Sequence, residues 1–123
     1  MPKIMVVDDD KEFTTLYSKY LNMVGFETIV ENHSSKAMEL ANSARPDLFI
    51  LDLMMPEPDG FKLCRMLRAN KNFARTPIII VTALNDDDSK IVAIGAGASD
   101  YLTKPFHIDN LKSRIDFLLE KSK

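Results

Sequence analysis

The stretch Leu48-Phe49-Ile50-Leu51-Asp52-Leu53-Met54-Met55-Pro56 decides the fold of this chain. Its first four residues are apolar and lie between Pro46-Asp47 and a loop from Pro56 to Gly60. A short apolar run between turn residues indicates a strand that is buried on both faces of a parallel sheet. Asp52 then stands at the end of that strand, where an enclosed carboxylate needs a cation, hydrogen bonds or a function.

The rest of the chain alternates short apolar runs with segments in which apolar residues recur at helical spacing. The predicted strands are residues 4–7, 26–30, 48–51, 78–82 and 100–103. The predicted helices run from Phe13 to a stop at Gly25, from a cap at Ser34 or Ser35 to Ala44, from Phe61 to Arg68, from Asp86 to Gly95, and from Ile108 until the chain frays over residues 120–123. This alternation, without a repeat or a low-complexity linker, predicts one α/β domain over residues 1–123, with helices on both faces of a parallel sheet.

The composition narrows the class of protein. A chain of 123 residues and 13.9 kDa has room for one domain with its own core. Its net charge of -2 and its lack of a lysine or arginine block argue against direct nucleic-acid binding. Cys64 is the single cysteine, so we expect no disulfide framework, and we expect Cys64 itself to be a small buried residue. No apolar stretch approaches a signal peptide or a membrane span, which favours a cytoplasmic protein without membrane contact.

Residues that can carry chemistry follow the predicted strands at the same end. They are Asp8, Asp9, Asp52, Thr82 and Lys104. Ligands of parallel α/β sheets bind outside the carboxyl ends of the strands, so we expect these side chains to meet at one edge. Three carboxylates gathered there repel one another, which raises a proton affinity or recruits a cation. Mg²⁺ suits such a site, with Asp9 and Asp52 as direct ligands and Asp8 bound through water.

A carboxylate beside Mg²⁺, a lysine and a hydroxyl can accept a phosphoryl group. Aspartate is a known nucleophile in phosphoryl transfer and forms an acyl phosphate. Because catalysis of this reaction is mostly positioning and electrostatics, the metal and the Lys104 ammonium would neutralise two phosphoryl oxygens. Thr82 would donate a hydrogen bond to a third oxygen.

Four motifs resemble the receiver domain of two-component response regulators, and together they span nearly the whole chain. The motifs are Val6-Val7-Asp8-Asp9-Asp10, Ile50 to Pro56 with Asp59-Gly60, Val81-Thr82-Ala83, and Asp100-Tyr101-Leu102-Thr103-Lys104-Pro105-Phe106. The resemblance implies a flavodoxin-like parallel sheet of strand order 2-1-3-4-5 with helices on both faces. The Glu57-Pro58 pair departs from the family, in which many members have a glycine and an apolar residue.

The resemblance also implies a role for each site residue. Asp52 corresponds to the phospho-acceptor, and Asp8, Asp9, Asp52 and the Met54 backbone carbonyl correspond to the metal ligands. Lys104 and Thr82 correspond to the phosphate-binding pair, Thr82 and Tyr101 to the switch residues, and Lys104-Pro105 to a cis peptide bond.

The same resemblance implies a signalling function. A histidine kinase or histidine phosphotransfer protein would donate the phosphoryl group in a step that uses Mg²⁺, with Mn²⁺ as the alternative ion. The domain would catalyse only its own phosphorylation and dephosphorylation. Phosphorylation would then change the packing of the face formed by the fourth helix, fifth strand and fifth helix. This change would control dimerisation or the binding of an unidentified output partner.

Other interpretations remain open at this level. A haloacid-dehalogenase-type phosphatase needs a second aspartate two residues after the first, where this chain has Met54. A flavodoxin-like mononucleotide binder needs a phosphate loop that Asp8 to Asp10 would repel. A scaffold that works without phosphorylation is the third alternative. Single residues also have structural explanations: Asp9 and Glu12 fit a helix capping box, Thr82 fits a strand, and Lys104 fits a solvated turn.

Overall fold

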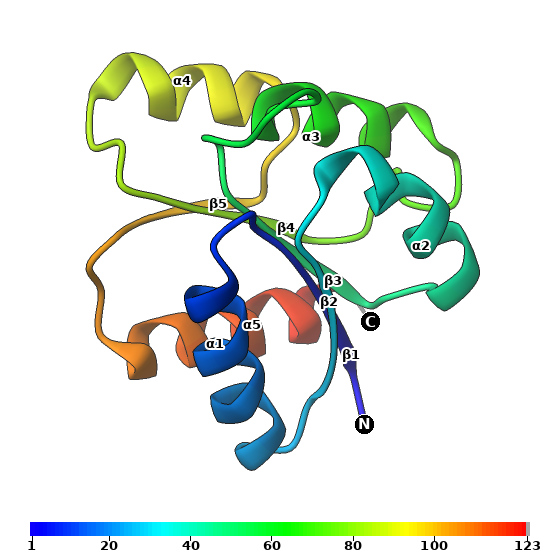
Figure 1. Cartoon of the computed structure of the whole chain (residues 1–123), viewed down its shortest axis with the longest axis vertical. Coiled ribbons are helices and arrows are strands. Elements are labelled where there is room, and N and C mark those ends of the chain that lie inside the picture. The colour runs from blue at the N-terminus through cyan, green and yellow to red at the C-terminus, as the bar shows by residue number, and fades with distance from the viewer. Residues whose placement is uncertain (123) are drawn as a thin grey trace.

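A computed structural model describes residues 1–122 and contains one five-stranded parallel sheet (Figure 1). The strands are β1 (Lys3–Val7), β2 (Glu27–Glu31), β3 (Leu48–Leu51), β4 (Ile78–Thr82) and β5 (Asp100–Thr103). Their order is β2-β1-β3-β4-β5, which confirms the predicted flavodoxin-like sheet. The helices are α1 (Lys11–Met23), the 3₁₀ turn η1 (Ser34–Lys36), α2 (Ala37–Ala44), α3 (Gly60–Ala69), α4 (Asp87–Gly95) and α5 (Ile108–Lys121).

The sheet separates two layers of helices, with α1 and α5 on one face and α2, α3 and α4 on the other (Figure 1). Successive strand residues point to opposite faces, so each strand contributes to two apolar clusters. In β3, Phe49 and Leu51 pack in the cluster with Leu63 and Leu67 of α3. Leu48 and Ile50 belong to the other cluster, which includes residues of α1 and α5. All four β3 residues are buried, as predicted for the central strand.

Several local predictions were wrong because the side chains have other partners. Neither predicted serine caps α2, since the Ser34 hydroxyl donates instead to the Pro56 carbonyl at 2.7 Å and the Lys36 N-cap has no side-chain cap bond. Asp10, and not Asp9, caps α1 by accepting from the backbone N–H groups of residues 12 and 13. The helix cap therefore does not account for Asp9.

Two other predictions, the helix stop at Gly25 and the buried Cys64, were confirmed. Gly25 follows the α1 C-cap with a φ of 101°, in the region that favours glycine at a helix stop. Cys64 is fully buried in α3. The prediction that the last helix frays from residue 120 was wrong, because α5 continues to Lys121; residue 123 lies outside the described part of the chain. Within residues 1–122, no helix combines the length and the apolar character that a membrane crossing requires.

Gly60 opens α3 where the loop from Asp52 returns against the end of β3. A Cβ atom at this position would collide with the Asp52 carbonyl oxygen and lie 2.6 Å from the Leu53 Cα. Both neighbours are backbone, so the loop itself would have to move. We expect Gly60→Ala to lower the free energy of unfolding by about 3 kcal/mol, measured by urea denaturation.

Gly95 provides the matched control for Gly60. It also lies in a helix, but a Cβ there would meet nothing within 4 Å. We expect Gly95→Ala to be neutral or stabilising by up to about 1 kcal/mol. Equal stability of the Gly60 and Gly95 variants would show that the backbone approach at Asp52 is not tight.

Candidate functional site

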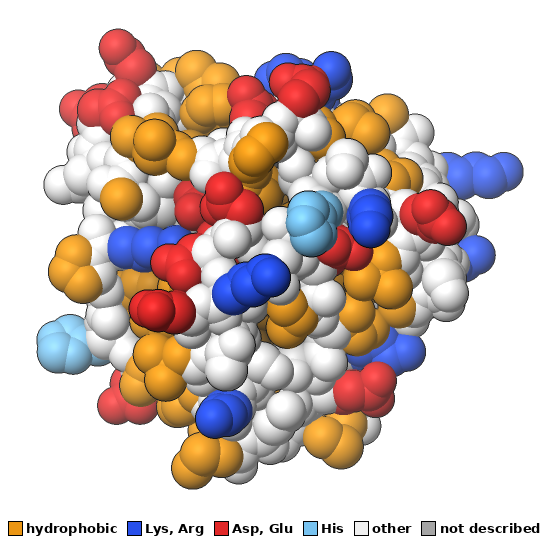
Figure 2. Space-filling model, viewed as in Figure 1, with side chains coloured by type: hydrophobic (Ala, Val, Ile, Leu, Met, Phe, Trp, Pro, Cys, Tyr) orange, Lys and Arg blue, Asp and Glu red, His pale blue; other side chains and the backbone are white. Residues whose placement is uncertain are grey.

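Three carboxylates meet at the carboxyl ends of β1 and β3. The two strands pair in register, Val7 opposite Leu51, and the Asp52 N–H donates to the Val7 carbonyl at 3.1 Å. This register brings one carboxylate oxygen each from Asp8, Asp9 and Asp52 within 4.8 Å of one another. On the face shown in Figure 2, acidic and basic side chains gather where Figure 1 shows the end of β1.

The three carboxylates differ in exposure, which leaves the cluster open on one side. Asp8 is buried with 1% of its surface exposed, Asp52 is half-buried, and Asp9 is exposed. Hard oxygen donors with one side open to solvent suit Mg²⁺, which keeps several of its water ligands. The donor set and its opening therefore fit the predicted ion.

Asp8 is the most firmly held member of the cluster. Its Oδ1 accepts from the Asp10 N–H at 3.0 Å, and the Asn32 amide donates to the Asp8 backbone carbonyl at 2.8 Å. Burial raises the pKa of the Asp8 carboxyl, and the hydrogen bonds from Asp10 and Lys104 offset only part of that rise. A nearby cation is the natural compensation for such a buried acid.

Lys104 supplies one such cation from the end of β5. Its ammonium lies 3.0 Å from Asp8 Oδ2 and 3.3 Å from Asp52 Oδ2. Its backbone N–H donates to the Thr82 carbonyl at 2.7 Å, and the Lys104–Pro105 peptide bond is cis. Burial alone would lower the pKa of Lys104, but the hydrogen bond to Asp8 and the charges of Asp52 and Asp8 raise it overall. The ammonium is therefore fully charged at neutral pH.

The hydroxyl groups of Thr82 and Tyr101 both form hydrogen bonds with the backbone of Leu84. Thr82 ends β4 and is fully buried, and its hydroxyl accepts from the Leu84 N–H at 3.4 Å. The Tyr101 hydroxyl of β5 donates to the Leu84 carbonyl at 2.7 Å. One residue of the β4–α4 loop thus connects the two predicted switch side chains.

The loop after β3 carries the remaining predicted site residue. The Met54 N–H donates to Asp52 Oδ1 at 3.3 Å, and the Met54 side chain is 61% exposed. Glu57, at the position that departs from the family pattern, is exposed and pairs with Lys62 at 2.6 Å. The Glu57–Pro58 peptide bond is also cis.

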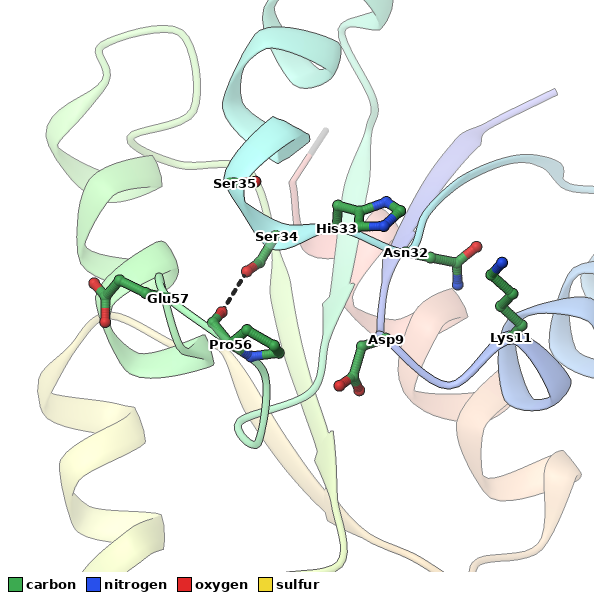
Figure 3. Close-up of a pocket in the computed structure, with 8 residues that line it drawn as sticks. All are labelled: Asp9, Lys11, Asn32, His33, Ser34, Ser35, Pro56 and Glu57. Atoms are coloured by element: carbon green, nitrogen blue, oxygen red, sulfur yellow. Dashed lines mark hydrogen bonds between the residues drawn. The ribbon is translucent and has the colours of Figure 1, made fainter.

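A pocket of about 190 Å³ adjoins the cluster at Asp9 (Figure 3). Figure 3 shows the β2–η1 connection facing the loop that carries Pro56, with the bond from Ser34 to Pro56 between them. The lining residues are Asp9, Lys11, Asn32, His33, Ser34, Ser35, Pro56 and Glu57.

Sequence reasoning missed two residues that contact the site. Asn32 directly follows β2 at the same edge of the sheet, so its position after a predicted strand could have indicated that it lies near the site. Phe13 places its ring 3.9 Å from the Lys104 ammonium, measured to the ring centroid. The sequence showed Phe13 only as an apolar residue of a helix, because the contact depends on where the end of β5 lies.

The comparisons with known proteins agree with one another. The family model described as the response regulator receiver domain matches residues 4–116. The chain is 38% identical over 122 residues to the DNA-binding dual master transcriptional regulator RpaA of Synechocystis, a match that covers 99% of this chain and 51% of that protein. It is 35% identical to the alkaline phosphatase synthesis transcriptional regulatory protein PhoP of Bacillus subtilis, covering 98% of this chain and 49% of that protein. The chain thus spans about half the length of the curated relatives it matches.

Solved structures agree with these sequence matches. The receiver domain of the Francisella response regulator 1452 superposes with a TM-score of 0.92 at 37% identity, and both chains are covered completely. The BeF₃-activated N-terminal receiver domain of Klebsiella pneumoniae RstA gives a TM-score of 0.90 at 37% identity, covering 95% of this chain and 97% of that one.

Proposed function

Since this chain belongs to the response regulator receiver domain family of two-component systems, we propose that Asp52 accepts a phosphoryl group from a histidine kinase or histidine phosphotransfer protein in the cytoplasm. In this proposal residues 1–123 act as one receiver unit. The observation that carries the proposal is the Lys104 ammonium, which bridges the buried Asp8 and the half-buried Asp52 beside the open cluster.

The reaction follows from the chemistry of a carboxylate nucleophile. One Asp52 oxygen attacks phosphorus, and the bond from phosphorus to the donor's imidazole nitrogen breaks as the acyl phosphate forms. The donor ring is protonated on its other nitrogen, so the electron pair of the broken bond leaves with a neutral imidazole. Asp52 is only partly buried, whereas Asp8 is buried, so Asp52 is the more accessible of the two carboxylates. The Lys104 ammonium would stabilise the charge on the transferring group, and the Thr82 hydroxyl would donate to one of its oxygens.

The acidic cluster is the proposed metal site. Asp8, Asp9, Asp52 and the Met54 carbonyl would hold Mg²⁺, or Mn²⁺ in its place. Receiver domains use Mg²⁺, and the ion would supply charge neutralisation at the phosphoryl oxygens. Hydrolysis of the acyl phosphate at the same site would return the domain to its resting state, so the domain would catalyse only its own modification.

Metal removal provides the direct test of this function. We expect intact-mass spectrometry of the wild-type protein to show a single phosphoryl adduct after incubation with acetyl phosphate and Mg²⁺. With excess chelator in place of Mg²⁺, we expect the adduct to form slower by about two orders of magnitude or more, because the carboxylate charges then repel the incoming phosphoryl group. Equal adduct formation in both conditions would exclude a metal-dependent acceptor site.

The hydrogen bonds through Leu84 support a route from the site to the surface. When the Thr82 hydroxyl turns to the acyl phosphate, it gives up the bond from the Leu84 N–H, and the Tyr101 hydroxyl is bonded to the same residue. We propose that this change alters the face formed by α4, β5 and α5. The two helices carry exposed apolar side chains, which are Ile91, Val92 and Ile94 of α4 and Phe117 of α5. The face would bind an output partner or a second copy, which size-exclusion chromatography with and without beryllofluoride distinguishes.

A further inference from the structure

An aromatic ring completes the surroundings of the Lys104 ammonium. Two carboxylate oxygens lie 3.0 and 3.3 Å from Lys104 Nζ, and the Phe13 ring centroid lies 3.9 Å from it. A cation within about 6 Å of a ring centroid is attracted by the negative face of the ring. The Lys104 side chain is only 22% exposed, so the surrounding water weakens this attraction less than at an open surface.

Phe13 is itself held in place from both sides. Its backbone N–H donates to the Asp10 side chain in the helix cap, so the turn that follows Asp8 and Asp9 also fixes Phe13. The centroid of its ring lies 4.2 Å from that of Tyr17, and the Tyr17 centroid lies 5.4 Å from that of Phe106, which directly follows Lys104-Pro105. The three rings connect the start of α1 to the loop after β5.

We propose that Phe13 is a positioning residue for phosphoryl transfer, which keeps the Lys104 ammonium over Asp52 while the phosphoryl group arrives. The proposal rests on the phosphoryl-acceptor function above. A lysine side chain has four rotatable bonds, and its ammonium is strongly hydrated, so an unsupported Lys104 would spend time in solvent. The Phe13 ring attracts the ammonium through its quadrupole and brings no oxygen atom that would compete with the carboxylate and phosphoryl oxygens.

The ring also acts in the resting and the phosphorylated states alike. The Asp52 carboxylate loses charge at one oxygen when it becomes an acyl phosphate, and the contact of Lys104 with Asp52 changes accordingly. The Phe13 ring lies on a helix that carries its own cap, and it need not move when this change occurs. It therefore supplies an attraction to Lys104 that does not depend on the charge of Asp52.

The test compares Phe13→Leu with Phe13→Tyr. Leucine keeps an apolar side chain but has no π face, whereas tyrosine keeps the face. We expect Phe13→Leu to slow phosphorylation by acetyl phosphate about 3- to 30-fold at saturating Mg²⁺. We expect Phe13→Tyr to remain within about twofold of the wild type, because its ring has a comparable quadrupole. Rates come from time courses of intact-mass spectra, and urea denaturation checks that each variant is folded.

A double-mutant cycle separates positioning from packing. In a Lys104→Gln background, we expect Phe13→Leu to cause no further loss of rate, because no ammonium remains for the ring to hold. An equal loss in both backgrounds, or a wild-type rate for Phe13→Leu alone, would overturn the proposed role. If the wild-type protein itself took up no phosphoryl group, the acceptor function would fail first, so the two failures are distinguishable.

Discussion

Asp52→Asn is expected to abolish phosphorylation by acetyl phosphate. The carboxamide has nearly the same shape as the carboxylate, but it lacks the anionic oxygen that attacks phosphorus. Asp8 and Asp9 remain in this variant, yet Asp8 is buried and held by the Asp10 N–H and Lys104. We therefore expect no adduct in intact-mass spectra at times when the wild-type protein is fully modified.

Asp87→Asn is the matched control for this experiment. Asp87 is an exposed aspartate on the first turn of α4, outside the carboxylate cluster. We expect this variant to be phosphorylated at the wild-type rate, since the same chemical change is made away from the site. Wild-type levels of adduct on the Asp52 variant would mean that another side chain is the acceptor.

Lys104→Gln is expected to slow phosphorylation by about 10²- to 10³-fold, the typical effect of removing one group that stabilises charge in a transition state. Glutamine can still donate a hydrogen bond, so the loss reports the missing charge. The measurement is the rate of adduct formation at saturating Mg²⁺. Lys112, which forms an exposed ion pair with Asp116 at 2.7 Å, provides the control, and Lys112→Gln should leave the rate unchanged. Equal rates for both variants would remove Lys104 from the site.

Lys104→Gln should also change how stability depends on pH in the absence of metal. Burial raises the folded-state pKa of Asp8 above its usual value, so ionised Asp8 is destabilised in the folded protein. Lys104 offsets part of this rise, so the pKa of Asp8 is raised further when Lys104 is replaced. The variant's loss of stability is therefore greatest above the folded pKa of Asp8 and decreases as the pH falls through it. Urea denaturation at neutral and acidic pH, with chelator present, measures the difference.

The location of the site residues could be predicted from the sequence because these residues lie at the ends of predicted strands. Each of Asp8, Asp52, Thr82 and Lys104 ends or follows a predicted strand, and parallel pairing brings those strand ends to one edge. The Lys104–Asp8 contact links residues 96 positions apart, and parallel pairing places both at the same edge of the sheet, although β3 and β4 lie between their strands.

Contacts between side chains could not be predicted in the same way. The hydroxyl of Ser34 and the ring of Phe13 each suit a local helix, but their partners come from distant segments. Asp9 and Glu12 fitted a capping box in the sequence, but the structure has Asp10 as the N-cap of α1. Ile91 and Ile94 lie three residues apart in α4, a spacing typical of one helix face, yet they are 67% and 63% exposed, whereas Ala93 of the same helix is buried.

The identity of the modified residue is the most direct test of the proposed function. After phosphorylation with acetyl phosphate and Mg²⁺, borohydride reduction converts an aspartyl phosphate to homoserine, and tandem mass spectrometry of the peptides locates it. We expect homoserine at position 52 alone, and only in samples that received both the phosphodonor and Mg²⁺. Homoserine at Asp8 or Asp9, or its absence from every peptide, would contradict the assignment of Asp52 as the acceptor.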